Sequence, residues 1–422
     1  MRRKFETVKG TYEYLPDKQV VREEIKSTLQ ATFIKYGFAP VETPILTTYE
    51  LLASKYSEGA DILEEMYTLS DRGKRNLGLR YDLTVAFCKL ISSNGAIVLP
   101  FKRYEIGKVF RDGPVRVGRN REFTQCDVDM VGIDSMMAEA EYMTMADEAY
   151  RNLGLDVKIK FNNRKLLSGI IMCVCGNVNE SLNRNIIMLI DKFAKMSDEE
   201  LEKQFSEIGV STVQYATLRE LLSSDFTTLQ QKLSAYPTND LLADGIREVK
   251  ELYSFMAGTS AADRMVFVPY LARGIDIYTG TVWEVFLTNG IIKGENEVID
   301  FTNTSIGGGG RYDKIITTFI DDGKAYPAVG MTFGLDVIYE ILVRQDNVNK
   351  RSYVDLYVIP MGTERESFAF VTNLRNAGLN VEVEKNIGKL KNVWIMQIKR
   401  ISHSPVLLVV MKSKKTRFSS KI

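Results

Sequence analysis

The sequence has little histidine and cysteine for a chain of its length. Among 422 residues there is one histidine, His403. The four cysteines lack the spacing of zinc motifs and of secreted disulfide frameworks, and Cys173-x-Cys175 is expected to serve only in packing. Catalysis by histidine and ordinary zinc catalysis are therefore nearly excluded.

Strong net charge and long apolar runs are also missing. The chain has 55 Lys and Arg against 54 Asp and Glu, so no overall basic field points to nucleic acid, and any such contact needs a local patch. No stretch is long enough to span a bilayer, and the N-terminus has no apolar run of signal length. We expect a cytoplasmic protein with no membrane partner. The length allows two or three domains, and 45% hydrophobic residues support a sizeable core.

Two glycine-containing segments stand out. Residues 271–280 read Leu-Ala-Arg-Gly-Ile-Asp-Ile-Tyr-Thr-Gly, followed by an alternating strand pattern over 281–286. A fixed guanidinium at Arg273 can bind a carboxylate or phosphate through two parallel bonds, although a salt-bridged turn is the alternative. Residues 305–313 contain four consecutive glycines, which let a small ligand approach the backbone. The spacing fits neither a P-loop nor a dinucleotide-binding motif.

A predicted hairpin brings opposite charges together. Residues 101–111 and 121–130 alternate as two strands joined by a polar loop. On the second strand one face carries Gln125, Asp127 and Asp129. With Arg111 on the first strand, this face combines a phosphate-binding cation with acceptors for an ammonium group. A solvated sheet face is the alternative interpretation.

Three other segments have local signatures. Residues 19–37 have the apolar spacing of an amphipathic helix, and 38–46 run extended because two prolines disfavour helix before them. Asp82, in an otherwise apolar stretch, is costly to bury unpaired, and it can instead cap the helix expected from Val85. Residues 197–200, Ser-Asp-Glu-Glu, are typical of a helix start.

Together these segments resemble the histidyl-tRNA synthetases. The segments around Arg273 and the glycine run are similar to the paired histidine-binding signatures of that family. Residues 19–46 resemble motif 1 of class II synthetases, the hairpin of 101–130 resembles motif 2, and the strand and helix pattern of 328–339 resembles motif 3.

The resemblance implies an α+β fold, with a class II synthetase antiparallel sheet flanked by helices. A catalytic domain would span residues 1–345, with a helical insertion at about 165–257. A small α/β anticodon-binding-like domain would span 353–422. Motif 1 implies a homodimer.

The resemblance also implies function and site residues. The chain would activate L-histidine with ATP, with Mg²⁺ present, to histidyl-adenylate and transfer the histidine to tRNA(His). Arg273 and Arg111 would be catalytic. The histidine-binding residues would be Asp82, Leu83, Thr84, Arg111, Gln125, Asp129, Arg273, Ile277, Tyr278 and Tyr312. The ATP-binding residues would be Arg111, Arg119 and Arg121. No metal-ligand motif is expected.

Three positions depart from the family pattern. Asn120 replaces the usual tyrosine in the motif 2 loop, and Thr124 stands where histidine or tyrosine often precedes the glutamine. Val337 stands where motif 3 usually has arginine, which removes one expected ATP contact.

Two alternatives remain open. A non-catalytic relative, the ATP phosphoribosyltransferase regulatory subunit, shares the fold, and Val337 points that way. The retained Arg111, Gln125, Asp129 and Arg273 favour the synthetase. A purely structural RNA-binding module is disfavoured by the near-neutral charge.

The family pattern stops after about residue 392. Reverse translation of residues 394–404, regrouped one base earlier, allows L-D-Y-A-N-K-K-N-I-P-F, the text that the family leads one to expect. A divergent but genuine tail is the alternative. We predict a shifted reading frame, poor order beyond Val393, normal adenylate formation and impaired tRNA charging. The sheet begun at Val354 would then have an open edge.

Overall fold

The computed structural model describes residues 5–54, 61–176, 178–273, 277–293, 298–345, 354–385 and 407–412. The chain divides into two compact units. The larger unit comprises Met1–Tyr12 and Ile25–Ile341, and the smaller comprises Glu13–Glu24 and Leu342–Ile422. In the described part of the chain, no helix is long and apolar enough to cross a membrane.

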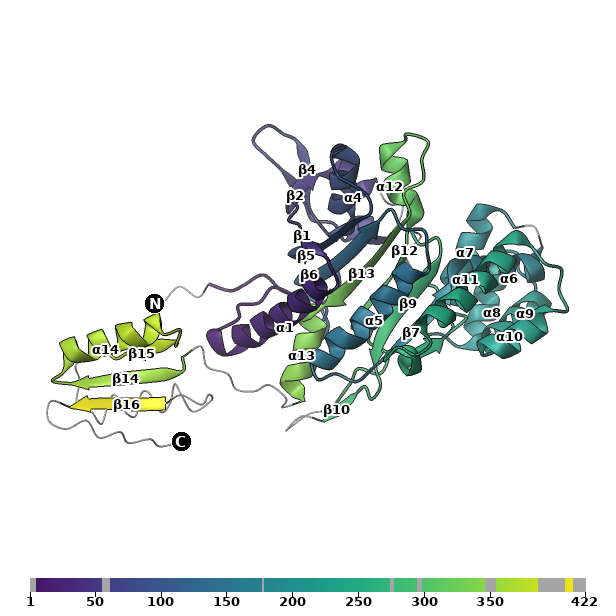
Figure 1. Cartoon of the computed structure of the whole chain (residues 1–422). Helices are drawn as coiled ribbons and strands as arrows, with labels where there is room; N and C mark the ends of the chain where they lie inside the picture. Colours follow the sequence, from purple (N-terminus) through teal and green to yellow (C-terminus); the bar gives the residue numbers. More distant parts are fainter. Residues whose placement is uncertain are drawn as a thin grey trace. The chain divides into compact units, whose positions relative to one another are not determined.

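An eight-stranded sheet organises the larger unit (Figure 1). In spatial order its strands are β1 (Ala39–Pro40), β5 (Phe101–Phe110), β6 (Glu122–Val131), β13 (Ala328–Gly334), β12 (Gly307–Arg311), β9 (Thr281–Leu287), β7 (Val157–Asn163) and β8 (Met265–Phe267). The two edge pairs, β1 with β5 and β7 with β8, are parallel, and the other pairs are antiparallel. The expected antiparallel class II sheet is confirmed, and so is the hairpin of β5 and β6.

One face of this sheet is apolar and covered by helices. It presents Cys126, Val128, Met331, Phe333, Trp283 and Val285, all of them buried. Helix α5 (Met137–Asn152) crosses it, and the hydroxyls of Tyr142 and Tyr150 donate to the carbonyls of Val329 and Ile306 at 2.9 Å. Helix α1 (Pro16–Lys35) adds Phe33, whose ring centroid lies 5.4 Å from that of Phe333.

The opposite side of the sheet, called here the polar face, carries charged and small residues in cross-strand rows. One row contains Arg103, Asp129, Gly330 and Gly310. The next row contains Glu105, Asp127, Thr332, Gly308 and Glu284. Because side chains of a strand alternate between faces, the pattern that makes one face apolar makes the other polar.

Shorter elements border the polar face. Strands β2 (Leu46–Thr48), β4 (Asn76–Leu79) and β3 (Thr68–Ser70) form a small antiparallel sheet. Helix α4 (Thr84–Ser93) packs against α12 (Asp313–Ile320), and α2 (Tyr49–Ala53) packs against the small sheet. Two further helices are α3 (Asp61–Glu64) and α13 (Leu335–Arg344). Strands β10 (Ile291–Lys293) and β11 (Val298–Asp300) pair as a hairpin.

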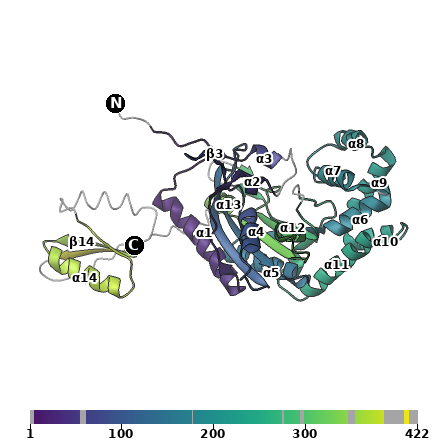
Figure 2. The same cartoon turned by 90° about the horizontal axis from the view of Figure 1, so that it is seen from above.

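Most of the described residues between 164 and 256 are helical. The helices are α6 (Arg164–Cys175), α7 (Glu180–Ile190), α8 (Asp198–Glu207), α9 (Thr212–Leu222), α10 (Phe226–Leu233) and α11 (Asp240–Met256), followed by the short 3-10 helix η1 (Ala262–Arg264). They gather into one group in both views (Figure 1, Figure 2). The predicted helix start is confirmed, because Ser197 caps α8 by accepting from the Glu200 amide. Small residues allow close packing here: a β-carbon at Gly245 of α11 would lie 2.2 Å from the Leu166 nitrogen of α6.

The smaller unit contains a three-stranded parallel sheet. Its elements are β14 (Leu356–Met361), α14 (Glu364–Asn376), β15 (Val381–Val383) and β16 (Leu407–Lys412), with β14 in the centre. The expectation that the tail leaves this sheet with an open edge at β14 is wrong, because β16 pairs with all six residues of β14. Residues 386–406 and 413–422, where the rest of the tail prediction falls, lie outside the described residues.

Candidate active site

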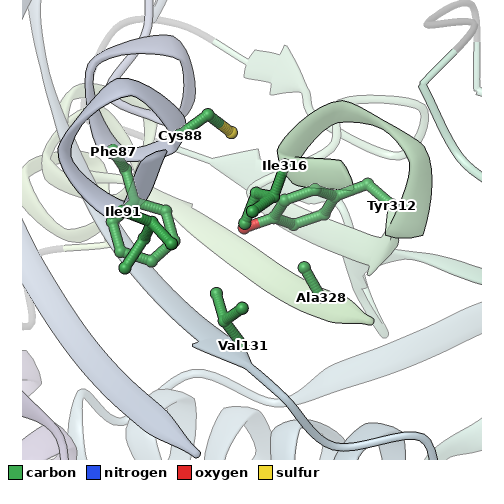
Figure 3. Packing of buried hydrophobic residues seen from close by; sticks show 7 residues of the cluster. All are labelled: Phe87, Cys88, Ile91, Val131, Tyr312, Ile316 and Ala328. Carbon is green, nitrogen blue, oxygen red and sulfur yellow. The ribbon is translucent and has the colours of Figure 1, made fainter. Parts of the chain in front are cut away.

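An apolar cluster closes one end of the polar face. Its buried members are Phe87, Cys88, Ile91, Val131, Tyr312, Ile316 and Ala328, drawn in Figure 3. Helices α4 and α12 supply most of them, and partly buried Ile277 and Tyr278 pack against the cluster. The ring of Tyr312 lies inside this cluster, while its hydroxyl donates a hydrogen bond to Asp129 Oδ1. Tyr312 therefore joins the apolar end of the face to its charged part.

Buried ion pairs hold the first charged row in place. Arg103 Nη2 lies 2.6 Å from Asp129 Oδ2 and donates to the Leu83 carbonyl at 3.2 Å. Arg103 Nη1 lies 3.4 Å from Glu105 Oε2. The arginine is fully buried, and its guanidinium carbon lies 4.4 Å from the centroid of the Phe87 ring. The Asp129 carboxylate is thus already bound by a cation and by the Tyr312 hydroxyl.

A second buried arginine neutralises Glu105. Arg80 Nη1 donates to Glu105 Oε1 at 2.8 Å, and Thr43 donates to the same oxygen from both its amide and its hydroxyl at 2.9 Å. A β-carbon at Gly107 would lie 2.3 Å from Arg80 Nη2, so glycine is required for Arg80 to cross the strand there. The Glu105 carboxylate is therefore occupied by contacts within the protein.

Gln125 and Asp127, on the same face of β6, each keep an acceptor oxygen that no described donor reaches. Gln125 Nε2 donates to Thr332 Oγ1 at 3.4 Å, and the Thr332 hydroxyl hydrogen-bonds to Asp127. Within the described part of the chain, no donor reaches buried Gln125 Oε1 or Asp127 Oδ1. Burial and the adjacent Asp129 charge raise the pKa of Asp127 to about 7, although Arg103 lowers it.

Asp82 and Leu83 lie in the turn between β4 and α4, and Thr84 is the first residue of α4, so Asp82 is not part of a strand. Asp82 Oδ1 accepts from the Val85 amide at 3.1 Å and so bonds the first turn of α4, although the N-cap position itself is Leu83. The charge of Asp82 also raises the pKa of Asp127, which places this turn beside the second charged row. Arg111 borders the same turn, because its Nε donates to the Tyr81 carbonyl at 3.1 Å.

Arg273 lies over the glycine strand. Its φ of 47° is in the left-handed region, which non-glycine residues rarely adopt. Nη1 donates to the Trp283 carbonyl at 3.3 Å, and Nε lies 3.6 Å from Glu284 Oε1. A β-carbon at Gly308 would lie 2.6 Å from Arg273 Nη1. The residues that follow, Gly274 to Asp276, lie outside the described residues.

The glycine run makes room for neighbouring protein side chains. Its residues form the buried strand β12, and protein side chains occupy the space that the missing β-carbons leave. A β-carbon at Gly310 would lie 2.6 Å from the Tyr278 ring, and one at Gly308 would meet Arg273. Gly308 and Gly310 therefore make room for the side chains of Arg273 and Tyr278, and the approach of a small ligand to this strand stays a prediction.

The other two arginines of the predicted site, Arg119 and Arg121, lie on the loop between β5 and β6. Arg119 Nη2 is 3.1 Å from Glu65 Oε1, and Arg121 Nη2 is 3.1 Å from Asp112 Oδ1. Their side chains are 50% and 30% exposed, so both cations can exchange a carboxylate partner for a phosphate.

Val337, where an arginine was expected, lies in the first turn of α13. A β-carbon at Gly118 of the β5–β6 loop would lie 2.9 Å from Val337 Cγ2, so the loop packs directly against this position. The neighbouring Asp336 accepts from the Thr124 amide at 2.8 Å and thereby joins α13 to β6.

Comparison with known proteins agrees with this architecture. The family model described as Histidyl-tRNA synthetase matches residues 10–338. This chain belongs to the histidyl-tRNA synthetase family. Over 386 residues it is 46% identical to Histidine–tRNA ligase 1 of Bacillus cereus, an alignment that covers 91% of this chain and 85% of that one.

Solved structures share the fold at lower identity. A histidyl-tRNA synthetase from Nostoc sp. PCC 7120 has a TM-score of 0.79 at 23% identity, covering 97% of this chain and 92% of that one. A Bacillus halodurans protein described as an ATP phosphoribosyltransferase regulatory subunit/histidyl-tRNA synthetase has a TM-score of 0.78 at 20% identity, covering 97% of this chain and all of that one. At such identity only the fold is shared, and fold alone does not separate the two functions.

In this member of the synthetase family, the polar face brings together residues from four distant segments: Asp82–Thr84, Gln125 with Asp129, Arg273 with Tyr278, and Tyr312. The predicted set omitted Arg103 and Asp127. The alternation of β5 and β6 places both residues on the same face as the predicted ones; this signal could have found Arg103, and it had already placed Asp127 on that face without including it among the site residues. Their importance depends on the pairing of each charge, which alternation does not reveal.

Proposed function

We propose that this chain is a histidine–tRNA ligase, which activates L-histidine with ATP to histidyl-adenylate and transfers the histidine to tRNA(His). The observation that carries the proposal is the polar face itself. Acceptor oxygens of β6 lie in the same part of the sheet as the Arg273 guanidinium, which suits the ammonium and carboxylate of an amino acid. The relatives named Histidine–tRNA ligase identify histidine as that amino acid.

The residues have distinct roles in the proposed activation step. The histidine carboxylate attacks the α-phosphorus of ATP, and pyrophosphate leaves. Arg273 and Arg111 hold the carboxylate and the α-phosphate, because positioning and charge stabilisation supply most of the catalysis in phosphoryl chemistry. Gln125, Asp129 and the turn of Asp82, Leu83 and Thr84 surround the ammonium. Ile277, Tyr278 and Tyr312 border the imidazole ring.

ATP would contact the β5–β6 loop through Arg111, Arg119 and Arg121. Mg²⁺ is implied by ATP, but the residues present do not form a ready-made cage for it. Among the described residues, no group of three or more His, Cys, Asp or Glu side chains could hold a metal ion. Mg²⁺ characteristically binds through substrate phosphates and few carboxylates, so it would arrive with ATP.

The partners extend beyond the small substrates. The larger unit would act as the catalytic domain, with α6–α11 as its helical insertion, and the smaller unit would bind the anticodon of tRNA(His). The family resemblance favours a homodimer in the cytoplasm.

The competing function is that of an ATP phosphoribosyltransferase regulatory subunit. The feature that favours it is Val337 in place of arginine. ATP–pyrophosphate exchange with histidine separates the two functions. Exchange that depends on histidine is expected for the ligase, whereas a purified, folded chain that binds histidine without exchange would favour the regulatory subunit.

A further inference from the structure

One residue, Arg164, binds both ends of the segment that carries Arg273 and Tyr278. Arg164 Nη1 donates to the Ala272 carbonyl at 2.9 Å, and the Arg164 amide donates to the Gly280 carbonyl at 2.8 Å. Ala272 is fully buried, so its carbonyl needs a donor from the protein. The side chain of Arg164 therefore binds the end of the segment next to Arg273, and its backbone binds the end nearer to Tyr278.

A side chain of β7 also holds the residues that come before Ala272. Asn162 Nδ2 donates to the Pro269 carbonyl at 2.7 Å and to the Leu271 carbonyl at 3.0 Å. Both carbonyls lie beyond the end of β8, where a side-chain amide takes the place of strand pairing. The chain therefore reaches the site through carbonyls that the end of β7 and the start of α6 hold in place.

Arg164 is itself fixed, because it is the buried first residue of α6. Asn163 caps this helix by accepting from the amides of Lys165 and Leu166 at 2.9 and 3.1 Å. The side chains of Asn163 and Lys165 donate to buried Glu248 of α11 at 2.7 and 2.5 Å. The two packed helices α6 and α11 therefore form a fixed base for the Arg164 side chain.

The charges of Arg164 and Lys165 are unfavourable for helix α6 alone. The N-terminus of a helix carries a partial positive charge, so cations in the first turn lower the stability of the helix. Lys165 is compensated by Glu248, and Arg164 is compensated by its bond to the Ala272 carbonyl. A residue that opposes the local preference of its helix is expected where another contact requires it, which for Arg164 is the contact to the segment before Arg273.

The Ala272 carbonyl controls the backbone of Arg273. This carbonyl belongs to the rigid peptide plane that ends at the Arg273 nitrogen, and the next rotation, φ of Arg273, sets where the side chain points. That φ is 47°, a strained value for arginine, and strained conformations persist only where surrounding contacts hold them. Arg164 supplies such a contact through a charged donor, which bonds more strongly than a neutral one. In this conformation the Arg273 guanidinium lies over Gly308.

We propose that Arg164 is a positioning residue for adenylate formation, which holds Arg273 in the left-handed conformation that orients its guanidinium toward the substrate. The inference rests on the proposed function and deepens it, because it makes the site depend on the residue that begins α6, the first helix of the proposed insertion. Arg164 acts through Arg273 and does not itself contact histidine or ATP.

The test is a double-mutant cycle in histidine-dependent ATP–pyrophosphate exchange, with Arg164→Ala, Arg273→Gly and the double variant. Substitution of Arg164 removes only the bond to the Ala272 carbonyl, because the backbone bond to Gly280 does not depend on the side chain. We expect Arg164→Ala alone to lower exchange by about 10- to 100-fold, the range for a hydrogen bond from a charged donor. In the Arg273→Gly background, the same substitution should lower exchange by about 3-fold or less, since no guanidinium is left to orient. A purely structural role of Arg164 would instead multiply the two losses.

Arg375→Ala provides the matched control. Arg375 of α14 donates to the Val381 carbonyl at 2.9 Å from Nε and at 2.6 Å from Nη2, so it also joins a helix to a backbone carbonyl. It belongs to the smaller unit, which takes no part in the proposed adenylate formation. Its substitution should therefore leave exchange within about 2-fold of the parent.

Each adverse outcome has a distinct meaning. Normal exchange in Arg164→Ala, or an equal loss in both backgrounds, would overturn the positioning role and leave the proposed function standing. Absence of exchange in the unmodified chain would overturn both. If Arg164→Ala does not fold, Arg164→Lys completes the same cycle, because its ammonium nitrogen ends one bond short of the position of Nη1. This variant should lose at least about 3-fold in exchange, and no loss, or an equal loss in Arg273→Gly, refutes the proposal.

Discussion

Replacement of Arg273 tests the charge at the centre of the proposed mechanism. The side chain is 14% exposed, lies over Gly308 and contacts Glu284 at 3.6 Å. Burial raises the pKa of Glu284, and the Arg273 charge lowers it. Removal of the guanidinium therefore takes away a preorganised cation and favours the protonated form of Glu284. A preorganised donor aimed at developing charge supplies about 3–4 kcal/mol, so Arg273→Ala should slow adenylate formation by roughly 100-fold or more.

The left-handed backbone of Arg273 offers a matched pair of variants. With φ at 47°, alanine would keep the conformational strain, whereas glycine would remove it, a difference of about 1 kcal/mol in stability. Arg273→Gly should therefore be the more stable variant. Both variants lack the guanidinium, so both should lose exchange activity by a similar factor. Arg273→Lys keeps the charge without the planar fork and should have intermediate activity.

The assay is histidine-dependent ATP–pyrophosphate exchange, measured beside urea unfolding of each variant. An effect through the site lowers kcat while the free energy of unfolding stays within about 1 kcal/mol of the parent. Near-normal exchange in Arg273→Gly would refute the assignment of this arginine. If Arg273→Gly had much higher exchange activity than Arg273→Ala, backbone strain and not the lost charge would explain the loss of activity in Arg273→Ala.

Three further predictions concern selectivity, stability and the tail. A pocket that hydrogen-bonds an imidazole leaves polar groups unpaired around apolar analogues, so exchange with phenylalanine or leucine should be weaker by roughly 10⁴- to 10⁵-fold. Comparable rates with these amino acids would contradict the prediction. In the core, Arg311 Nε donates to Glu139 Oε1 at 2.7 Å and Arg311 Nη2 donates to Glu139 Oε2 at 2.9 Å. Arg311→Met should therefore cost about 3–5 kcal/mol in urea unfolding. Lys314→Met, at an exposed position, should stay within about 0.5 kcal/mol. Sequencing of the coding DNA should reveal an Ile-Pro-Phe continuation in the other frame after residue 392. If the DNA has that continuation, the present chain, which lacks it, should show impaired tRNA charging and normal exchange.

Local pattern decided much of the fold. Alternation predicted β5 and β6 and assigned Gln125, Asp127 and Asp129 to one face, because side-chain direction in a strand depends only on position. The Ser197 cap and the Asp82 cap follow equally from local chemistry, since each bonds an amide three residues ahead. Helix α1 was predicted to start at residue 19, but it starts at Pro16. Proline is favourable in the first turn of a helix, so the earlier start is also consistent with local chemistry.

The tail shows where local pattern was insufficient. Residues 407–412 were expected to be poorly ordered, yet they form β16 beside β14. A short apolar run such as Leu-Leu-Val-Val has no periodicity that specifies a partner, and here the strand is defined by hydrogen bonds to a segment far away in the chain.

The sequence by itself determined which residue types face each side of the sheet and, through its motifs, the family. Only the tertiary structure decided which charges are satisfied. Gln125 meets Thr332 across 207 positions of sequence, and the same register places Asp127 beside Thr332 and Thr332 beside Gly308. Because register is fixed by hydrogen bonds and packing between distant strands, the pairing of Asp129 with Arg103 and the open acceptor of Asp127 could not be read from either strand alone.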